Sequence, residues 1–156
     1  MDDKTNVIRI LDKQKIKYKC YNYDNAKAYS GTEVAQMINK PFEKVFKTLV
    51  LTSKSKRNYV FVVPVEKTLD LKKAAKIVGE KNVEMLPMKE LLPLTGYVHG
   101  GCSPIGMKKF FRTIIDISAK CFEEIIFSAG KIGMQVEMSL TDLEKVIKVE
   151  YSDVTE

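Results

Sequence analysis

Residues 45–65 contain two apolar segments separated by a short polar one. Residues 45–52 and 59–65 are rich in β-branched and aromatic side chains, whereas residues 53–58 between them are polar. This arrangement is typical of a β-hairpin. Because the second segment is apolar on both of its faces, we expect it to be a central strand that is covered on both sides.

Helices are predicted where apolar stripes or capping signals occur. The four segments are residues 4–14, 30–38, 71–78 and 141–148. Ser30 and Glu33 have the three-residue spacing of a capping box, and so do Thr141 and Glu144. Gly79 directly follows the third segment and is typical of a C-terminal helix stop.

The remaining segments predict short strands with short helical insertions. The strand-like runs are residues 18–23, 83–86, 97–99, 113–117, 124–128 and 134–138. Six or seven short strands with helices at unequal intervals argue against a regular βαβ repeat. We therefore expect an α+β fold with a central mixed, curved or barrel-like sheet flanked by helices. No linker or internal repeat divides residues 1–156, so a single domain is expected.

The charged residues include a surplus of lysine. Lys and Arg number 26 against 20 Asp and Glu, which gives a formal net charge of +6. Arg9, Arg57 and Arg112 are the only arginines. Lysine suits delocalised contact with phosphates better than rigid bidentate recognition of bases. The balance permits an RNA partner, although a modest lysine surplus more often forms a solvated surface.

Cysteine and histidine are too few and too scattered for several kinds of site. Cys20, Cys102 and Cys121 are far apart and form no CxxC pair, so neither a disulfide framework nor a zinc finger fits. His99 is the only histidine, which excludes a multi-histidine metal site. The longest apolar run, residues 59–63, is far short of the ~20 residues of a membrane span. We expect a soluble cytoplasmic protein, with Cys20 and Cys121 in its core.

Lys47 is unusual because it lies inside the first predicted strand. The two-residue period places it on the same face as Val45, Leu49 and Leu51. One interpretation is structural: the strand opens at a sheet edge, and the ammonium reaches water or pairs with an acid. The other is functional: Lys47 lines a pocket and binds an anion or a polarised carbonyl.

Two glycine-containing segments follow predicted strands, at residues 100–106 and 128–133. Such a backbone can approach a ligand closely and offer N–H groups to a phosphate or an oxyanion. Neither segment matches the P-loop or the dinucleotide fingerprint, and tight structural turns are the alternative. Cys102, three residues after His99, also permits a nucleophile and base, but the sequence shows no cause for a lowered thiol pKa.

Positive side chains gather in two further places. The clusters are Lys108, Lys109 and Arg112 after the first glycine segment, and Lys72, Lys73 and Lys76 on the third predicted helix. Either cluster can hold an RNA backbone, and either taken alone is more often a solvated face.

Four motifs occur in an order and spacing that resemble one protein family. They are Val-Phe-Lys-Thr-Leu at 45–49, Leu-Asp-Leu-Lys-Lys-Ala-Ala-Lys at 69–76, Thr-Gly-Tyr-Val-His-Gly-Gly-Cys-Ser-Pro-Ile-Gly-Met-Lys-Lys at 95–109 and Phe-Ser-Ala-Gly-Lys at 127–131. Together they resemble the YbaK/EbsC family of Cys-tRNA(Pro) and Cys-tRNA deacylases. The resemblance implies an α/β domain with a central mixed β-barrel, related to the editing domain of bacterial prolyl-tRNA synthetases.

The resemblance also implies an activity, the hydrolytic removal of wrongly attached cysteine from tRNA(Pro). The implied partners are the acceptor end of that tRNA and prolyl-tRNA synthetase, with no membrane, DNA, metal or cofactor. In the family view the thiol of the substrate attacks its own ester carbonyl, so the enzyme needs no nucleophile. Two rivals stay open: an Ala-tRNA(Pro) deacylase that uses water, and a non-catalytic module that binds tRNA or synthetase.

The matching motifs also imply individual site residues. Lys47 matches the functional lysine of the family and is predicted to be catalytic. The predicted substrate contacts are Tyr23, Tyr29, Phe46, Thr48, Gly100, Gly101, Ser103, Ser128 and Gly130. Lys108, Lys109 and Lys131, beside the glycine segments, are predicted to contact the tRNA backbone. Some members carry an acid where this chain has Gln135, so no carboxylate role is transferred to that position.

Overall fold

The computed structural model describes residues 4–156. In chain order its elements, including two short 3₁₀ helices (η), are α1 Asn6–Lys13, β1 Lys19–Asn22, α2 Gly31–Met37, η1 Phe42–Lys44, β2 Phe46–Ser53, β3 Asn58–Pro64, α3 Leu71–Val78, β4 Val83–Met85, α4 Met88–Thr95, β5 Arg112–Asp116, η2 Ile117–Cys121, β6 Glu124–Lys131, β7 Met134–Ser139, α5 Leu140–Val146 and β8 Glu150–Ser152. Within this range, no helix combines the length and the apolar character that crossing a membrane requires.

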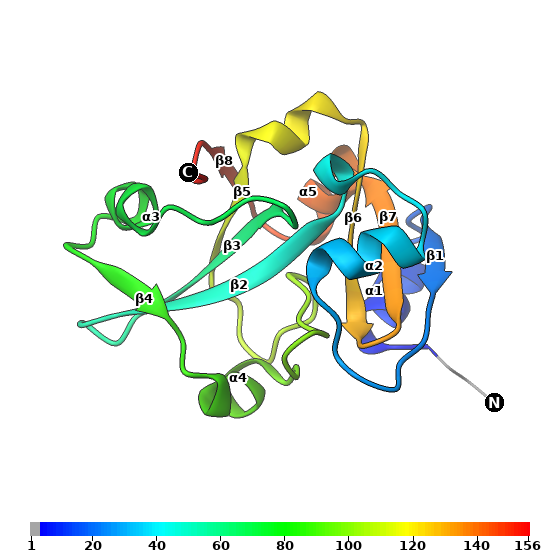
Figure 1. Ribbon diagram of the computed structural model, residues 1–156, viewed down its shortest axis with the longest axis horizontal. Helices are drawn as coiled ribbons and strands as arrows, with labels where there is room; N and C mark the ends of the chain where they lie inside the picture. Colours follow the sequence, from blue (N-terminus) through cyan, green and yellow to red (C-terminus); the bar gives the residue numbers. More distant parts are fainter. Residues whose placement is uncertain (1–3) are drawn as a thin grey trace.

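The strands form two sheets, so the α+β class is confirmed but the barrel is not closed (Figure 1). One sheet has the order β4-β2-β3-β5-β8, and the other has the order β1-β7-β6. An isolated bridge between Val45 and Ile126 connects them. The sheets instead pack through side chains, because Phe46 of β2 and Phe127 of β6 meet in one buried core. Burial of these apolar side chains thus replaces the edge hydrogen bonds that would close a barrel.

The hairpin of β2 and β3 is confirmed and lies at the centre of the larger sheet. The two strands pair antiparallel with Phe46 opposite Pro64, and β3 also pairs in parallel with β5. Alternate side chains of the hairpin enter two different cores. Those facing the smaller sheet are Phe46, Val50, Val60 and Val62, and those facing α3 are Leu51, Tyr59, Phe61 and Val63. Layers on both faces explain why residues 59–65 are apolar throughout.

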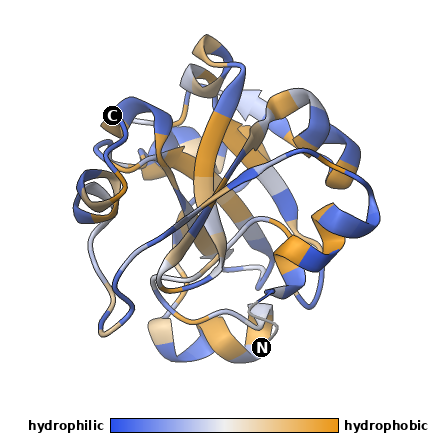
Figure 2. Cartoon of the chain, turned by 90° about the vertical axis from the view of Figure 1, so that its right-hand side faces the viewer, coloured by the Kyte–Doolittle hydropathy of each residue, from blue (hydrophilic) through white to orange (hydrophobic). Residues whose placement is uncertain are grey.

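The helices cover these cores with one face each, and Figure 2 shows hydrophobic and hydrophilic residues on the same helices. The capping box of α2 is confirmed: the Glu33 N–H donates to Ser30 Oγ at 3.2 Å, and the Ser30 N–H donates to Glu33 Oε1 at 2.9 Å. Gly79 ends α3 with a φ of 75°. The predicted capping box of the last helix is wrong, because Ser139 caps α5 and its Oγ accepts from the Asp142 N–H.

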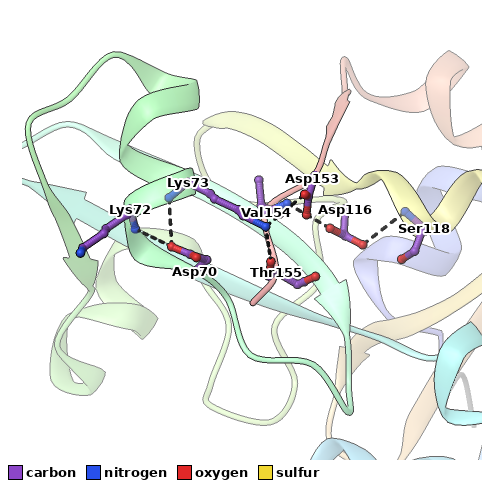
Figure 3. Close-up of polar contacts among 8 residues, drawn as sticks. All are labelled: Asp70, Lys72, Lys73, Asp116, Ser118, Asp153, Val154 and Thr155. Carbon is purple, nitrogen blue, oxygen red and sulfur yellow. Dashed lines mark hydrogen bonds and ion pairs between the residues drawn. The ribbon is translucent and has the colours of Figure 1, made fainter.

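The C-terminal segment, which the sequence did not predict as a strand, is held against the larger sheet by Asp116 (Figure 3). The buried carboxylate of Asp116 accepts hydrogen bonds from the Val154 N–H at 3.1 Å and from the Ser118 N–H at 3.2 Å. Lys73 of α3 donates to the Thr155 carbonyl at 2.7 Å and pairs with Asp153. These contacts satisfy backbone groups that β8 alone leaves unpaired.

Candidate functional site

A cavity of about 500 Å³ lies where the two sheets meet the glycine segment. Its walls come from β2, the start of α2, the segment from β4 to α4, residues 99–102, β6 and β7. Six predicted site residues line it together: Tyr29, Phe46, Lys47, Thr48, Gly100 and Ser128. The sequence motifs are far apart in the chain, and the fold brings them to one place.

Lys47 is half-buried in this cavity, and its ammonium has no hydrogen bond or ion pair within residues 4–156. The structural interpretation of Lys47 allowed an ion pair with an acid. A nearby lysine, Lys44, forms such a pair instead: its Nζ lies 2.6 Å from the buried Glu137 carboxylate. Burial lowers the pKa of Lys47 from its ordinary value. An unpaired cation with an apolar surrounding is suited to bind an anion or a developing negative charge.

Thr48 also presents a polar atom without a partner in the described part of the chain. Its Oγ1 is buried and accepts or donates no hydrogen bond there. A buried hydroxyl of this kind carries a desolvation cost unless a ligand or water satisfies it. Phe46, on the same side of β2 as Thr48, is almost fully buried and forms part of the apolar wall. The start of β2 therefore offers one free cation, one free hydroxyl and one apolar surface.

The glycine segment divides its residues between the cavity and the interior. Gly100 lines the cavity with a φ of 89°, a conformation that L side chains rarely adopt. Gly101 lies behind it, and its N–H donates to the Val98 carbonyl at 3.0 Å. A Cβ on Gly101 would lie only 3.0 Å from the Lys131 Cα, so the two glycine segments touch backbone to backbone. Ser103 is fully buried, and its Oγ accepts from the Ile105 N–H.

Ser128 connects the two glycine segments. Its Oγ donates to the Gly101 carbonyl at 3.0 Å and accepts from the Gly130 N–H at 3.1 Å. Gly130 has a φ of 105°, and a Cβ there would lie only 3.1 Å from the Val7 side chain and 3.3 Å from the Tyr97 ring. Ser128 thus both lines the cavity and fixes the backbone around it, whereas Gly130 supports the site from behind.

The two predicted tyrosines form the outer edge of the site. Tyr29 lines the cavity, and its hydroxyl donates to Asp24 at 2.7 Å. Tyr23 contacts the Tyr29 ring edge to face at 6.3 Å between centroids, and its hydroxyl accepts from Gln135 Nε2 at 3.4 Å. Tyr23 does not line the cavity itself, but it contacts Tyr29 and Gln135, which do.

The three predicted tRNA-contacting lysines surround the cavity rather than line it. Lys108 and Lys109 are exposed, and Lys108 Nζ donates to the Pro93 carbonyl at the end of α4 at 3.4 Å. Lys131 is partly exposed at the end of β6, where its backbone touches Gly101. Their charges thus lie on segments that adjoin the cavity walls.

Sequence reasoning missed an apolar part of the cavity wall that lies next to β2. Met85, Leu86, Met88 and Leu91 line the cavity from β4 and α4, although Met88 is 66% exposed. The signal available in the sequence was a short segment with one methionine and two leucines between Pro87 and Pro93. Gln135, which is almost fully buried, also lines the cavity.

Cys102 lines the cavity as a thiol rather than a thiolate. Its burial raises the pKa of the thiol to about 12, and no hydrogen bond joins it to His99 in the described residues. A catalytic cysteine needs the opposite shift and an oriented base, so the nucleophile hypothesis has no support here. The prediction that Cys20 and Cys121 belong to the core is wrong, because both are exposed. No group of His, Cys, Asp and Glu suited to a metal occurs among residues 4–156.

A family model described as the aminoacyl-tRNA editing domain matches residues 25–146. The chain belongs to this family. The matched range contains every residue that lines the cavity, from Tyr29 to Gln135.

Two individual proteins are similar to this chain over most of its length. The chain is 40% identical over 153 residues to a candidate Cys-tRNA(Pro)/Cys-tRNA(Cys) deacylase, EbsC, of Enterococcus faecalis, covering 97% of this chain and 93% of EbsC. It is 24% identical over 113 residues to the uncharacterized protein YwhH of Bacillus subtilis, covering 72% of this chain and 71% of YwhH. The resemblance of the sequence motifs to YbaK/EbsC proteins is thereby confirmed.

Solved structures share the fold of this editing domain. A candidate trans-editing enzyme for prolyl-tRNA synthetase superposes with a TM-score of 0.81 at 21% identity, over 97% of this chain and 98% of that one. A hypothetical protein superposes with a TM-score of 0.86 at 20% identity, over 97% of this chain and all of that one. The fold of this chain is therefore that of the trans-editing enzyme.

Proposed function

We propose that this protein is a deacylase that removes cysteine from mischarged tRNA(Pro) in trans. The observation that carries the proposal is the unpaired ammonium of Lys47 inside the cavity of an aminoacyl-tRNA editing domain. The 40% identity to a candidate deacylase for Cys-tRNA(Pro) and Cys-tRNA(Cys) supports the substrate class. Free tRNA(Pro) charged with cysteine and prolyl-tRNA synthetase are the proposed partners, in the cytoplasm, with residues 1–156 acting as one domain.

The cavity has the size and the polar groups that an aminoacyl-adenosine end requires. Its volume of about 500 Å³ falls within the usual range for sites that enclose small molecules. Lys47 would bind the phosphate or sugar region of the terminal adenosine. The Gly100 N–H, which has no acceptor within residues 4–156, would hold the ester carbonyl. The apolar wall of Met85, Leu86 and Leu91 would exclude water from the ester.

The proposed reaction uses the thiol of the substrate in place of an enzyme nucleophile. The cysteinyl sulfur attacks its own ester carbonyl, so that a C–S bond forms and the C–O bond to the ribose breaks. The thiol proton passes to the departing ribose oxygen, and the products are deacylated tRNA and a cyclic thiolactone. Because the ester is already activated, positioning and stabilisation of the oxyanion suffice for acceleration. The protonated Cys102 takes no covalent part.

The substrate series tests both the activity and its mechanism. Purified protein is incubated with tRNA(Pro) carrying cysteine, S-methylcysteine, alanine or serine, and the release of each amino acid is followed. We expect cysteine to be released roughly 100-fold faster than its S-methyl derivative, because blocking the thiol removes an intramolecular attack. Equal rates for all four esters would contradict assistance by the substrate thiol, and preference for alanine would indicate a deacylase that uses water. Binding without any release would indicate a non-catalytic module.

Lys108 and Lys109 are proposed to contact the tRNA backbone beside the cavity. The double variant Lys108→Gln and Lys109→Gln is expected to reduce the slope of log affinity against log salt by about 1 to 2, since each phosphate contact contributes about 0.9 to a duplex slope. Filter binding of tRNA(Pro) between low and moderate salt measures the slope. Lys13→Gln with Lys15→Gln at the end of α1 removes the same charge and is expected to leave the slope unchanged. An equal loss in both double variants would show that only total charge matters.

A further inference from the structure

A second cavity, of about 520 Å³, lies on the loop that also shapes the candidate site. Its walls come from α1, residues 104–113 and the end of α5. Gly100 and Cys102 line the first cavity, and Pro104 and Ile105 line the second. The proposed reaction involves no group of the second cavity, which raises the question of what binds there.

The second cavity has an aliphatic wall and an exposed aromatic side chain. Ile105 is fully buried, and Ile10 and Ile147 contribute further aliphatic surface. Phe110 lines the cavity but is 51% exposed, so part of it faces solvent. Gln14 also lines the cavity, and its side-chain amide forms no hydrogen bond within residues 4–156. A flat apolar ring beside a free amide suits a nucleobase, which offers a π face and polar edges.

The two residues directly before Phe110 are cationic. Lys108 and Lys109 are both exposed, and neither forms an ion pair within residues 4–156. Residues 91–115, which run from α4 into β5 and contain both lysines, include no Asp or Glu. Proteins that bind single-stranded nucleic acid combine an exposed aromatic ring, on which a base stacks, with cations that contact the phosphates. Phe110 and its two lysines have this combination.

The carboxylates on the elements around the second cavity are engaged by partners, and none of them lines the cavity. Glu150 of β8 accepts hydrogen bonds from Arg112 at 2.6 and 2.8 Å, and the lining residue Lys148 also attracts it. Arg112 and Lys148 are therefore occupied by Glu150, which leaves Lys108 and Lys109 available to a ligand beside Phe110. The other contacts of carboxylates on α1 and α5 are Asp12 with Lys4, Asp142 with Lys145 and Glu144 with the Tyr151 hydroxyl.

Lys108 also connects this surface to the candidate site. Its N–H donates to the Thr95 carbonyl at 3.0 Å and its Nζ donates to the Pro93 carbonyl at 3.4 Å, so it lies on the C-terminal end of α4. Met88 and Leu91 of the same helix line the first cavity. No residue that lines either cavity carries a carboxylate. An RNA end whose last nucleotide occupies the first cavity can therefore extend along this loop toward the second without meeting a lining carboxylate.

We propose that the second cavity receives a nucleobase from the unpaired 3′ end of the tRNA, stacked on Phe110, while Lys108 and Lys109 contact the adjacent phosphates. This inference rests on the proposed function, because it takes charged tRNA as the ligand of the first cavity. A single strand fits better than a duplex, whose paired and stacked bases leave no face for Phe110. The unpaired 3′ end is the part of the tRNA that must enter the first cavity, so it is also the part that can reach the second.

The test measures binding of a deacylated acceptor-stem minihelix of tRNA(Pro) to the full chain by fluorescence anisotropy. One minihelix carries the complete unpaired 3′ end, and the other is blunt. We expect the complete minihelix to bind at least about tenfold more tightly, the usual effect of one stacked base. Methyl NMR spectra locate the contact. The complete minihelix should shift the δ1 methyl signals of Ile10, Ile105 and Ile147, and not that of Ile114, which is buried in the core that faces α3.

Variants of Phe110 separate stacking from charge. Phe110→Ser is expected to weaken binding of the complete minihelix roughly tenfold and to leave the slope of log affinity against log salt unchanged, because stacking releases no counterions. Ile117→Ser truncates another exposed apolar side chain and should have no effect. Phe110→Trp keeps an aromatic face and should retain binding. Because the chain contains no tryptophan, the fluorescence of Phe110→Trp reports on this position alone. Its quenching by the complete minihelix, and not by the blunt one, tests the site even if Phe110→Ser does not fold.

Failure of this site and failure of the proposed function give different results. Binding with the expected effects at Phe110, but without release of cysteine in the substrate series, would refute the deacylase and support the site. Release of cysteine with equal binding of the two minihelices, or with unchanged affinity in folded Phe110→Ser, would overturn the site alone. Isoleucine signals that shift with prolyl-tRNA synthetase and not with RNA would overturn it in favour of a protein partner. A dimer that Phe110→Ser dissociates would overturn it in favour of a second copy of the chain.

Discussion

Replacement of Lys47 by methionine is expected to reduce release of cysteine from Cys-tRNA(Pro) by about 100-fold or more, the usual effect of removing a group that stabilises developing charge. Methionine keeps most of the length and shape of the unbranched side chain and removes the ammonium. Lys47 is the one cation that lines the cavity in the described range, so no neighbour replaces it. Single-turnover deacylation with excess protein measures the chemical step directly.

The same variant is expected to be at least as stable as the wild type at neutral pH. Burial lowers the pKa of Lys47, which means that the folded state disfavours its charged form. This cost is present below the lowered pKa and disappears as the pH rises through it toward the ordinary value of the unfolded chain. Lys47→Met removes the cost, so its thermal midpoint should be equal to or above that of the wild type.

Lys54→Met, in the exposed turn of the hairpin, is the matched control. It removes the same charge from the same part of the chain and should change neither the rate nor the thermal midpoint. Wild-type turnover in Lys47→Met would restore the interpretation of Lys47 as a structural lysine. A fall in stability together with a fall in rate would show that its ammonium supports the fold.

Replacement of Gly101 by valine is expected to separate the two glycine segments. A Cβ at this position would lie 3.0 Å from the Lys131 Cα and 3.1 Å from the Ile132 nitrogen, and these backbone atoms cannot rotate away. Overpacking of this kind costs about 1–3 kcal/mol. Because Ser128 bonds the Gly101 carbonyl, a shift of the loop would also move the wall that carries Gly100. We expect deacylation to fall by roughly tenfold or more, since small displacements of a positioned substrate are costly.

Urea unfolding and single-turnover deacylation measure the two effects of Gly101→Val separately. Ala26→Val, at an exposed loop position, introduces a similar side chain and should leave both unchanged. Ser128→Ala removes the hydrogen bonds between the segments without adding volume, and should reduce the rate less than Gly101→Val does. A Gly101→Val variant with wild-type stability and rate would mean that the segments can part without moving the cavity wall.

Local sequence patterns predicted those elements that are determined by neighbouring residues. The central hairpin followed from apolar runs on both sides of a polar turn, and the caps of α2 and α3 followed from Ser30, Glu33 and Gly79. The cap of α5 was misplaced, because strand β7 runs directly into the helix and Ser139 serves at the junction. Strand β8 is short and depends on Asp116, which is distant in sequence, so no local signal revealed it.

The sequence by itself determined the family, the central hairpin and the unusual position of Lys47, because motif spacing and the two-residue period of a strand are local properties. Only the tertiary structure decided that Glu137 pairs with Lys44 and leaves Lys47 free, and that Gly100 lines the cavity while Gly101 packs against Lys131. It also decided that β4 and α4 supply apolar lining to the cavity. These outcomes depend on contacts between segments far apart in the chain, where packing and the burial of charge select one partner among several that the sequence allows.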